Sequence, residues 1–275
     1  MEARCREVLD AAYGAGIRYF DVARSYGDAE AFVGRWLADR GLSDVEVGSK
    51  WGYVYVGDWR MDADVQEVKD LSVETLRRQA TESEVTLGRK PSPYQIHSAT
   101  IESGVFDDRR VIHELAGMRE AGWRLGFTTT GPRQADTIRR GIDLEADGVP
   151  LFTSVQSTWN VLEPSAGAAL MEARDRGCGI LIKEALANGR LAREEGPLAN
   201  IAARHRTTPD RIGIAAALGQ HLADIVLSGA ATPEQVRSNA AALRLTLTPD
   251  DLAELGALAQ TAERYWAERA GLPWS

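Results

Sequence analysis

The chain has 275 residues, a net charge of -8 and an isoelectric point near 5.2. This length suits one large domain such as an α/β barrel, so residues 1–275 are predicted to form a single domain. The acidic charge without a basic cluster excludes a nucleic-acid-binding face. No apolar run approaches the ~18 residues of a membrane span. The start lacks a signal-peptide core, and Cys5 and Cys178 have no CxxC partner, so we expect free thiols in the cytoplasm.

Helical and strand-like segments alternate along the chain. Helices are predicted over 2–15, from Asp28, over 70–88 and 107–121, from Gln134, from Pro164, within 197–220, from Thr232 and from Thr248. Between them lie seven strands, at 17–23, 45–52, 92–99, 124–131, 152–159, 179–187 and 224–231. Because these strands are nearly continuous in apolar residues, the pattern predicts a parallel sheet covered by helices on its outside.

Two segments lie outside this alternation and are rich in aromatic residues. The stretch 53–69 is long for a connection within a compact domain, which favours a lid or binding loop. It contains Tyr53, Tyr55 and Trp59, and the tail 265–275 contains Tyr265, Trp266 and Trp274. We expect the two segments to form the wall of a substrate pocket, although ordinary packing is the alternative.

Groups that hold or move protons stand at the ends of successive strands. Asp21, Lys50 and His97 each end a strand, and Tyr26 follows Asp21 by five residues. Only four lysines occur in the chain, so a lysine at a strand end is notable. In a parallel barrel the carboxyl ends of the strands share one face, where active sites form. One such residue alone would be explained by structure, but the set in this order indicates a catalytic site.

The four side chains suit proton transfer to a carbonyl oxygen, or from an alcohol. A free tyrosine has a pKa near ~10, and an adjacent ammonium lowers that value. A carboxylate would keep the lysine charged and in place, while a histidine could hydrogen-bond the substrate oxygen. Because none of these groups supplies a hydride, the chemistry requires a cofactor. No GxGxxG, P-loop, GxSxG or HExxH motif is present, and the four histidines lack metal-ligand spacing, so no metal is expected.

The chain resembles the aldo-keto reductase family from residue 3 to its end. The matching motifs are GIRYFDVARSYGDAE, VGSKWG, YQIHSA, LGFTTTGP, VQSTWN, ILIKEALANGRL and SGAATPEQVRSN. The resemblance implies a (β/α)8 TIM barrel that binds NADPH or NADH and reduces an aldehyde or ketone, or oxidises the corresponding alcohol or sugar. It assigns Asp21, Tyr26, Lys50 and His97 as the catalytic four, with Tyr26 as general acid. The substrate residues implied are Trp51, Tyr53 and Trp59.

The resemblance also implies a cofactor site, with departures. Its members here are Thr128, Thr129, Gln156, Lys183, Leu186, Gly189, Gly229, Ala230, Thr232, Gln235 and Asn239. Thr128 and Thr129 stand where the family usually has Ser-Asn, and Lys183 replaces a stacking aromatic. Gly229 and Gln235 stand where many members direct cations at the 2′-phosphate of NADP. By family habit NADP is expected, with NAD possible.

Family members begin with a base hairpin and a first strand that this sequence lacks. We therefore expect either a start further upstream or a barrel that is open between its last and first strands. Two other functions remain alternatives. One is a non-catalytic barrel that binds nucleotide and regulates a partner. The other is a lyase in which Lys183 forms a Schiff base.

Overall fold

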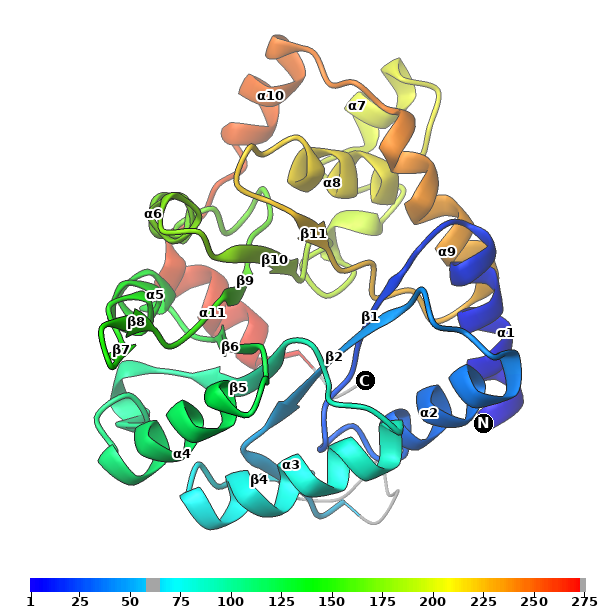
Figure 1. Ribbon diagram of the computed structural model, residues 1–275. Coiled ribbons are helices and arrows are strands. Elements are labelled where there is room, and N and C mark those ends of the chain that lie inside the picture. The colour runs from blue at the N-terminus through cyan, green and yellow to red at the C-terminus, as the bar shows by residue number, and fades with distance from the viewer. Residues whose placement is uncertain (58–64, 273–275) are drawn as a thin grey trace.

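The computed structural model describes residues 1–57 and 65–272. A seven-stranded sheet forms the centre, and every neighbouring pair in it is parallel. The strand order is β1-β2-β5-β6-β9-β10-β11, and all seven predicted strands are confirmed. They span Tyr19–Asp21 (β1), Glu46–Trp51 (β2), Tyr94–Ala99 (β5), Leu125–Thr129 (β6), Ser154–Thr158 (β9), Gly179–Lys183 (β10) and Ile225–Val226 (β11). The sheet curls, with the helices around its outside (Figure 1).

The curled sheet does not close on itself. β1 and β11 are its two ends, and within residues 1–57 and 65–272 they do not pair with each other. Outside this opening, α1 and α9 lie against each other (Figure 1). The sheet therefore has an open edge in the described part of the chain, and the expectation of a start further upstream stays a prediction.

Eleven α-helices are present in the described residues. They span Glu2–Gly14 (α1), Ala29–Arg40 (α2), Val73–Leu87 (α3), Arg109–Glu120 (α4), Gln134–Ile142 (α5), Gly167–Asp175 (α6), Ala199–Arg204 (α7), Pro209–Leu218 (α8), Pro233–Ala241 (α9), Pro249–Gly256 (α10) and Ala262–Ala270 (α11). Thr248 and Asp251 form a full capping box. Thr232 accepts a hydrogen bond from the backbone N–H of Gln235, but the Gln235 side chain turns to Ala231, so this cap is only half of a box.

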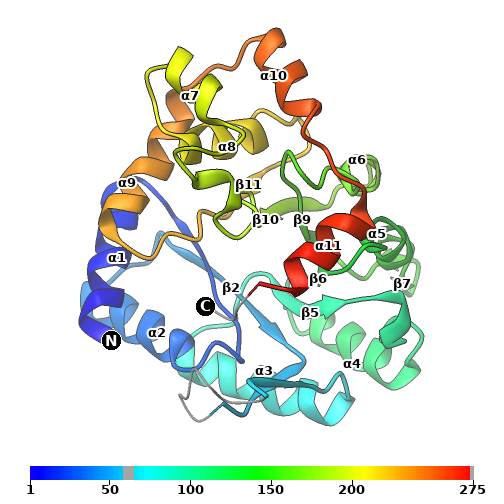
Figure 2. The same cartoon turned by 180° about the vertical axis from the view of Figure 1, so that it is seen from behind.

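Three elements were not predicted from the sequence. The stretch 53–69 contains an antiparallel hairpin of β3 (Tyr53–Tyr55) and β4 (Glu67–Lys69), and residues 58–64 lie outside the described part. A second hairpin joins β7 (Glu145–Ala146) and β8 (Val149–Pro150). The tail contains α11, which lies across the carboxyl ends of β9 and β10 (Figure 2). These strands have only two or three residues, too few for a periodic pattern to indicate them.

The interior of the sheet is polar, while its outer face is apolar. The largest core cluster lies between sheet and helices and includes Trp51, Ile96, Phe127 and Ile182, all fully buried. Inside the curl, glycines leave room for polar side chains. A Cβ added at Gly48 would lie 2.0 Å from the hydroxyl of Tyr19. This space lets Tyr19 reach towards the site described below.

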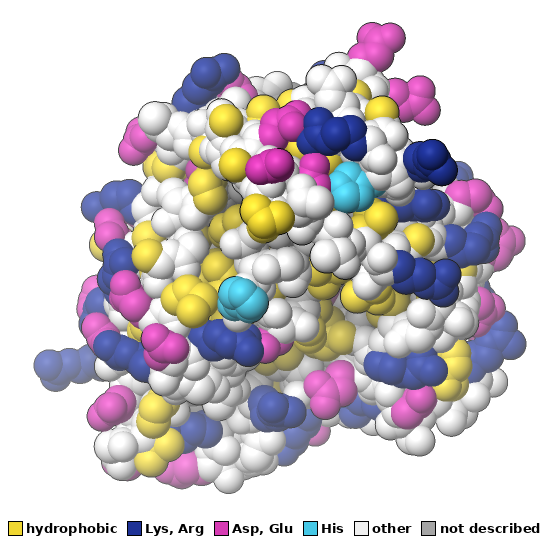
Figure 3. Space-filling model, turned by 90° about the horizontal axis from the view of Figure 1, so that it is seen from above, with side chains coloured by type: hydrophobic (Ala, Val, Ile, Leu, Met, Phe, Trp, Pro, Cys, Tyr) yellow, Lys and Arg dark blue, Asp and Glu magenta, His cyan; other side chains and the backbone are white. Residues whose placement is uncertain are grey.

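The surface above the sheet carries charges of both signs. On the face over α7 and α10, acidic and basic side chains are interspersed around yellow apolar ones (Figure 3). Among the helices of the described residues, none has the length and apolar character needed to cross a membrane.

Candidate active site

A buried ion pair joins β1 and β2. Lys50 is 2% exposed, and its ammonium donates to the Asp21 carboxylate and to the carbonyl of Val22 at 2.9 Å. Asp21 aligns with Gly48 in the strand register, which places Lys50 two residues further along the neighbouring strand. The other Asp21 oxygen accepts from Gln156 Nε2 at 2.9 Å and from the Tyr19 hydroxyl at 3.3 Å. Three side chains therefore fix one carboxylate.

Tyr26 brings its phenol next to this pair and to His97. It lies in the loop after β1 and is followed by Gly27, whose φ of 55° favours glycine. The Lys50 ammonium lies 5.0 Å from the centre of the Tyr26 ring. The Tyr26 hydroxyl lies 3.4 Å from Nε2 of His97. The structure thus brings together all four predicted catalytic side chains at one end of the sheet.

Burial sets the protonation of the Tyr26 phenol. Although 46% of Tyr26 is exposed, packing beside His97 and Lys50 withdraws its hydroxyl from water and raises its pKa above the ordinary value of 10.0. The Lys50 ammonium opposes this by favouring phenolate, as predicted. The expected net lowering of the pKa is not observed, because burial outweighs the charge. Tyr26 is therefore a protonated phenol at neutral pH, ready to donate.

His97 is neutral in this environment. It is 8% exposed, and burial is the main reason that its pKa falls well below 6.5, with further lowering by Lys50, Lys183 and Lys69. A neutral imidazole carries one N–H and one lone pair. Within the described residues its buried Nδ1 has no hydrogen-bond partner. The Tyr53 ring packs edge-on against the imidazole at 4.9 Å.

The lowered pKa of His97 predicts a pH-dependent stability. Because the folded pKa lies below that of the unfolded chain, the neutral form stabilises the fold above pH ~6.5, and this contribution is lost as pH falls towards the folded pKa. The slope approaches at most about 1.4 kcal/mol per pH unit. Urea unfolding at pH 7 and pH 5 should show a larger loss in the wild type than in His97→Gln. Equal losses would mean that His97 titrates normally.

The predicted residues on β6 and β9 mostly hold the site together. Thr128 accepts a hydrogen bond from the backbone N–H of Ser98 at 2.7 Å, next to His97. Thr129 is fully buried and donates to the Ser157 hydroxyl at 2.9 Å, on the side that faces α5. Its hydroxyl is therefore turned away from the four catalytic groups. Gln156 reaches those groups through Asp21.

Lys183 ends β10 and belongs to a charged cluster under α11. Its ammonium lies 3.7 Å from the Glu184 carboxylate and 6.0 Å from the centre of the Trp266 ring. Burial lowers the pKa of Lys183, and Glu184 opposes that shift. Glu184 accepts from Arg269 at 2.6 Å and from the Tyr265 hydroxyl at 3.2 Å. These contacts attach α11 to the end of β10.

The remaining predicted cofactor residues lie after β10 and around the start of α9. Leu186 is partly buried against the main core cluster and against a second cluster in the C-terminal half, and Gly189 adopts a positive φ of 82°. Gly229 has a φ of 63°, and Asn239 donates to the carbonyl and hydroxyl of Ser228. Ala230 precedes a cavity of about 190 Å³ at the N-terminus of α9. Its lining residues are Arg4, Glu7, Val8, Ala231, Thr232, Pro233 and Glu234.

The predicted substrate residues have different outcomes. Tyr53 lies beside His97, in a position to contact a substrate. Trp51 is 0% exposed and belongs to the main core with Val73 and Leu76, so its expected place in the pocket is corrected: alternation turns it to the helix side of β2. Trp59 lies outside the described residues. In the tail, Tyr265 and Trp266 belong to α11 and are buried in a core cluster with residues such as Leu191 and Ile201, and Trp274 also lies outside the described residues.

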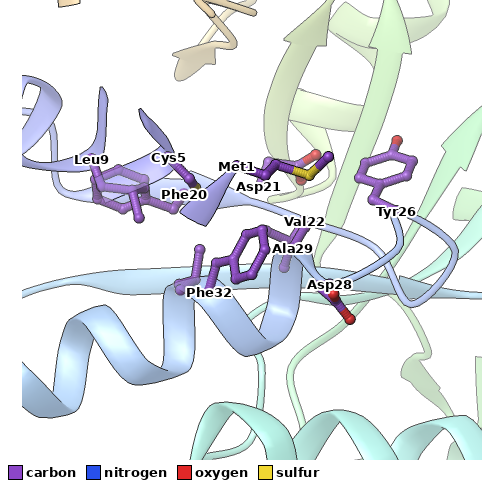
Figure 4. Close-up of a pocket in the computed structure, with 11 residues that line it drawn as sticks. Met1, Cys5, Leu9, Phe20, Asp21, Val22, Tyr26, Asp28, Ala29 and Phe32 are labelled. Carbon is purple, nitrogen blue, oxygen red and sulfur yellow. The ribbon is translucent and has the colours of Figure 1, made fainter. Parts of the chain in front are cut away.

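A cavity of about 320 Å³ opens beside β1 at the unpaired edge of the sheet. It lies between α1, β1 and α2, and apolar side chains such as Leu9, Phe20 and Phe32 make up most of its wall (Figure 4). Asp21 and Tyr26 line the same cavity, so the catalytic groups border an open space.

Several residues of the site were missed from the sequence. Tyr19 could have been found, because strand alternation places it on the same face as Asp21. Lys69 donates to the carbonyl of Ser98 from the unpredicted hairpin. Arg269 holds Glu184 from the unpredicted α11. The last two had no local signal, since their positions depend on how distant segments fold back.

Comparison with known proteins identifies the family of the chain. The model of the aldo/keto reductase family matches residues 2–260, so the chain belongs to this family and thereby to the NAD(P)-dependent oxidoreductases. It is 24% identical to the NADH-specific methylglyoxal reductase of Escherichia coli strain K12, over 94% of this chain and 89% of that protein.

Solved structures with the same fold include two further aldo-keto reductases. The holo form of AKR11C1 from Bacillus halodurans superposes with a TM-score of 0.73 at 20% identity, covering 97% of this chain and 91% of that one. The glycerol dehydrogenase AKR11B4 from Gluconobacter oxydans gives a TM-score of 0.75 at 19% identity, covering 99% and 88%. The predicted TIM-barrel fold is confirmed, with seven strands of its sheet present in the described residues.

Proposed function

We propose that this protein reduces the carbonyl group of a small aldehyde or ketone with NAD(P)H, or oxidises the corresponding alcohol or sugar, with Tyr26 as general acid or base. The observation that carries the proposal is the meeting of Tyr26, Lys50, Asp21 and His97 at the strand ends. A non-catalytic regulatory barrel would have no need to keep this set in contact. The free thiols Cys5 and Cys178 support a cytoplasmic location.

Each of the four side chains has a distinct role in this reaction. The phenol of Tyr26 is protonated at neutral pH and gives its proton to the developing alkoxide. Neutral His97 holds the substrate oxygen by its N–H and lies beside the Tyr26 hydroxyl. Lys50 stabilises the phenolate that remains, and Asp21 keeps Lys50 charged. When bound, the nicotinamide supplies the hydride.

The residues at the end of the sheet fit a nicotinamide cofactor. A cavity lies at the N-terminus of α9, which is the positive end of the helix dipole and favours phosphate groups. Gly229 has no other atom within 4 Å of an added Cβ, so backbone can be approached closely there. Gly229, Ala230 and Thr232 would hold the phosphates, and Thr128, Gln156 and Lys183 lie nearer the catalytic groups.

A cofactor titration followed by a turnover assay tests the proposal. NADH and NADPH fluorescence should change on addition of the protein, and methylglyoxal should then be reduced, as the name of the Escherichia coli relative suggests. Cofactor binding without turnover of any aldehyde, ketone, alcohol or sugar would favour the regulatory alternative. Failure to bind either cofactor would contradict the proposed function altogether.

The charges at the α9 cavity predict that NADH binds more tightly than NADPH, against the family habit. Glu7 and Glu234 line the cavity with one guanidinium, Arg4, and Gly229 and Gln235 provide no cation for a 2′-phosphate. Arg237, the alternative cation near this position, is paired with Glu234 at 2.7 Å. Like charges repel the extra phosphate. The double variant Glu7→Gln/Glu234→Gln should lower the Kd of NADPH several-fold and leave that of NADH unchanged. A wild-type preference for NADPH would restore NADP as the cofactor.

A further inference from the structure

Three of the four lysines of this chain lie around one histidine. Lys50, Lys69 and Lys183 all act electrostatically on His97, from β2, β4 and β10. Lys69 ends the β3–β4 hairpin and is exposed. Its ammonium donates to the carbonyl of Ser98 at 2.6 Å and lies 5.6 Å from the centre of the Tyr53 ring. It thus contacts Ser98, the residue that follows His97, at the rim of the proposed site.

The three lysines differ in whether a carboxylate neutralises them. Lys50 is paired with Asp21, and Lys183 lies beside Glu184. In residues 1–57 and 65–272, Lys69 has no carboxylate within ion-pair distance. Glu102 acts on it only from further away and is itself paired with Arg133. Of the three lysines, Lys69 is therefore the one without a carboxylate partner in the described part of the chain.

The hairpin itself does not cancel the charge of Lys69. Glu67 lies two residues before Lys69 on the same face of β4. Burial raises the pKa of the Glu67 carboxyl. Glu67 is not among the groups that shift the pKa of Lys69, and within residues 1–57 and 65–272 no ion pair joins the two side chains. Lys69 therefore presents its ammonium at the rim next to His97, in a chain whose net charge is -8.

We propose that Lys69 binds the carboxylate of an oxo-acid substrate, an aldehyde or ketone that carries a carboxylate a few atoms from its carbonyl. This inference rests on the proposed function, because it places the carbonyl of the substrate at Tyr26 and His97. An ammonium is a compact point charge on a flexible stem, so it can follow carboxylates at slightly different distances. The adjacent Tyr53 ring offers an apolar surface to the methylene groups between carbonyl and carboxylate.

The test compares two aldehydes that differ only at the end remote from the carbonyl. Succinic semialdehyde carries a carboxylate where butanal carries a methyl group. We expect wild-type kcat/KM to be higher for succinic semialdehyde, with the difference mainly in KM. Lys69→Met should lower kcat/KM for succinic semialdehyde roughly fivefold, the scale of a solvent-exposed ion pair, and change that for butanal less than about twofold. Added salt should weaken only the wild-type preference.

Lys90 provides a matched control. It is also exposed, donates to a backbone carbonyl, that of Ala121, at 2.7 Å, and lies 5.7 Å from the centre of the Trp123 ring. It precedes the amino end of β5, whereas His97 lies towards the carboxyl end of that strand, and it is not among the groups that shift the pKa of His97, Tyr26 or Lys50. Lys90→Met should therefore leave both substrates unaffected. Lys69→Arg should retain the preference, and Lys69→Glu should reverse it.

The outcomes separate this inference from the function on which it rests. If butanal and succinic semialdehyde are both reduced, but with equal kcat/KM in the wild type and in Lys69→Met, the anion subsite is refuted while the reductase stands. If Lys69→Met lowers kcat for both substrates equally, the role of Lys69 is to position Ser98 and His97, and the subsite is again refuted. If no carbonyl compound is reduced, the proposed function itself fails.

Discussion

Tyr26→Phe is expected to lower kcat for carbonyl reduction by ~10²–10⁴-fold, the usual contribution of general acid catalysis. The substitution removes only the hydroxyl that lies 3.4 Å from Nε2 of His97. The ring keeps its edge-on contact with His97, at 5.5 Å between centres, and its place beside the Lys50 ammonium. Because the fold and the cofactor contacts are left intact, the Kd of NADH should stay within a few-fold of wild type.

Tyr53→Phe is the matched control for this experiment. Tyr53 also packs edge-on against His97, at 4.9 Å between ring centres. Tyr53→Phe removes a phenol hydroxyl, which is the same chemical change as Tyr26→Phe. It should keep most of the activity, since the phenol of Tyr53 has no assigned part in proton transfer. Single-turnover kinetics with each variant would compare the chemical step directly. A Tyr26→Phe enzyme with more than about a tenth of wild-type turnover would remove Tyr26 from the mechanism.

The fold was predictable because its signals are local and repeated. Each sheet strand is an apolar run, and five of the eleven α-helices in the described residues start with a side chain, such as Ser72 or Thr248, that caps the backbone. The β3–β4 hairpin and α11 were missed because their stability comes from tertiary contacts. The position of α11 depends on Arg269, which donates a hydrogen bond to Glu184, 85 residues earlier in the sequence. Such long-range pairs leave no periodic pattern in the sequence.

The catalytic residues were predictable for a different reason. In a parallel sheet the strand ends meet, so strand-end acids and bases converge whatever the details of packing. At a strand end it is harder to predict whether a side chain points to the inner face of the sheet or to the helices. Trp51 and Thr129 were expected at the site, yet both are fully buried on the helix side of their strands. Their neighbours Lys50 and Thr128 occupy the inner face, as strict alternation requires.

The protonation state of Tyr26 also depends on how deeply its hydroxyl is buried, and no sequence motif contains that information. The Asp21, Lys50 and Tyr26 spacing predicted a lowered pKa for the phenol, and Lys50 does act in that direction. How strongly the hydroxyl is removed from water depends on the packing around His97. Burial of the hydroxyl raises the Tyr26 pKa more than the charge of Lys50 lowers it, so Tyr26 is protonated at neutral pH.

Lys50→Met is expected to move proton transfer by Tyr26 to higher pH. Since Lys50 is the main group that favours the phenolate, its loss should raise the Tyr26 pKa further. In alcohol oxidation the phenolate acts as base, so the rising limb of the pH–rate profile should shift to higher pH. At pH 7 the oxidation rate should fall about 10-fold or more.

The same substitution removes the cationic partner of a mostly buried carboxylate. Asp21 would keep Gln156 and Tyr19 as hydrogen-bond donors but lose its ion-pair partner, and breaking a buried pair costs about 3–5 kcal/mol. The double variant Lys50→Met/Asp21→Asn carries neither charge and should regain much of that stability. It should still show an upward-shifted pH profile, with a smaller shift than that of Lys50→Met, because Lys50 lowers the Tyr26 pKa more than Asp21 raises it. An unchanged profile in Lys50→Met itself would refute the direct effect of Lys50 on Tyr26.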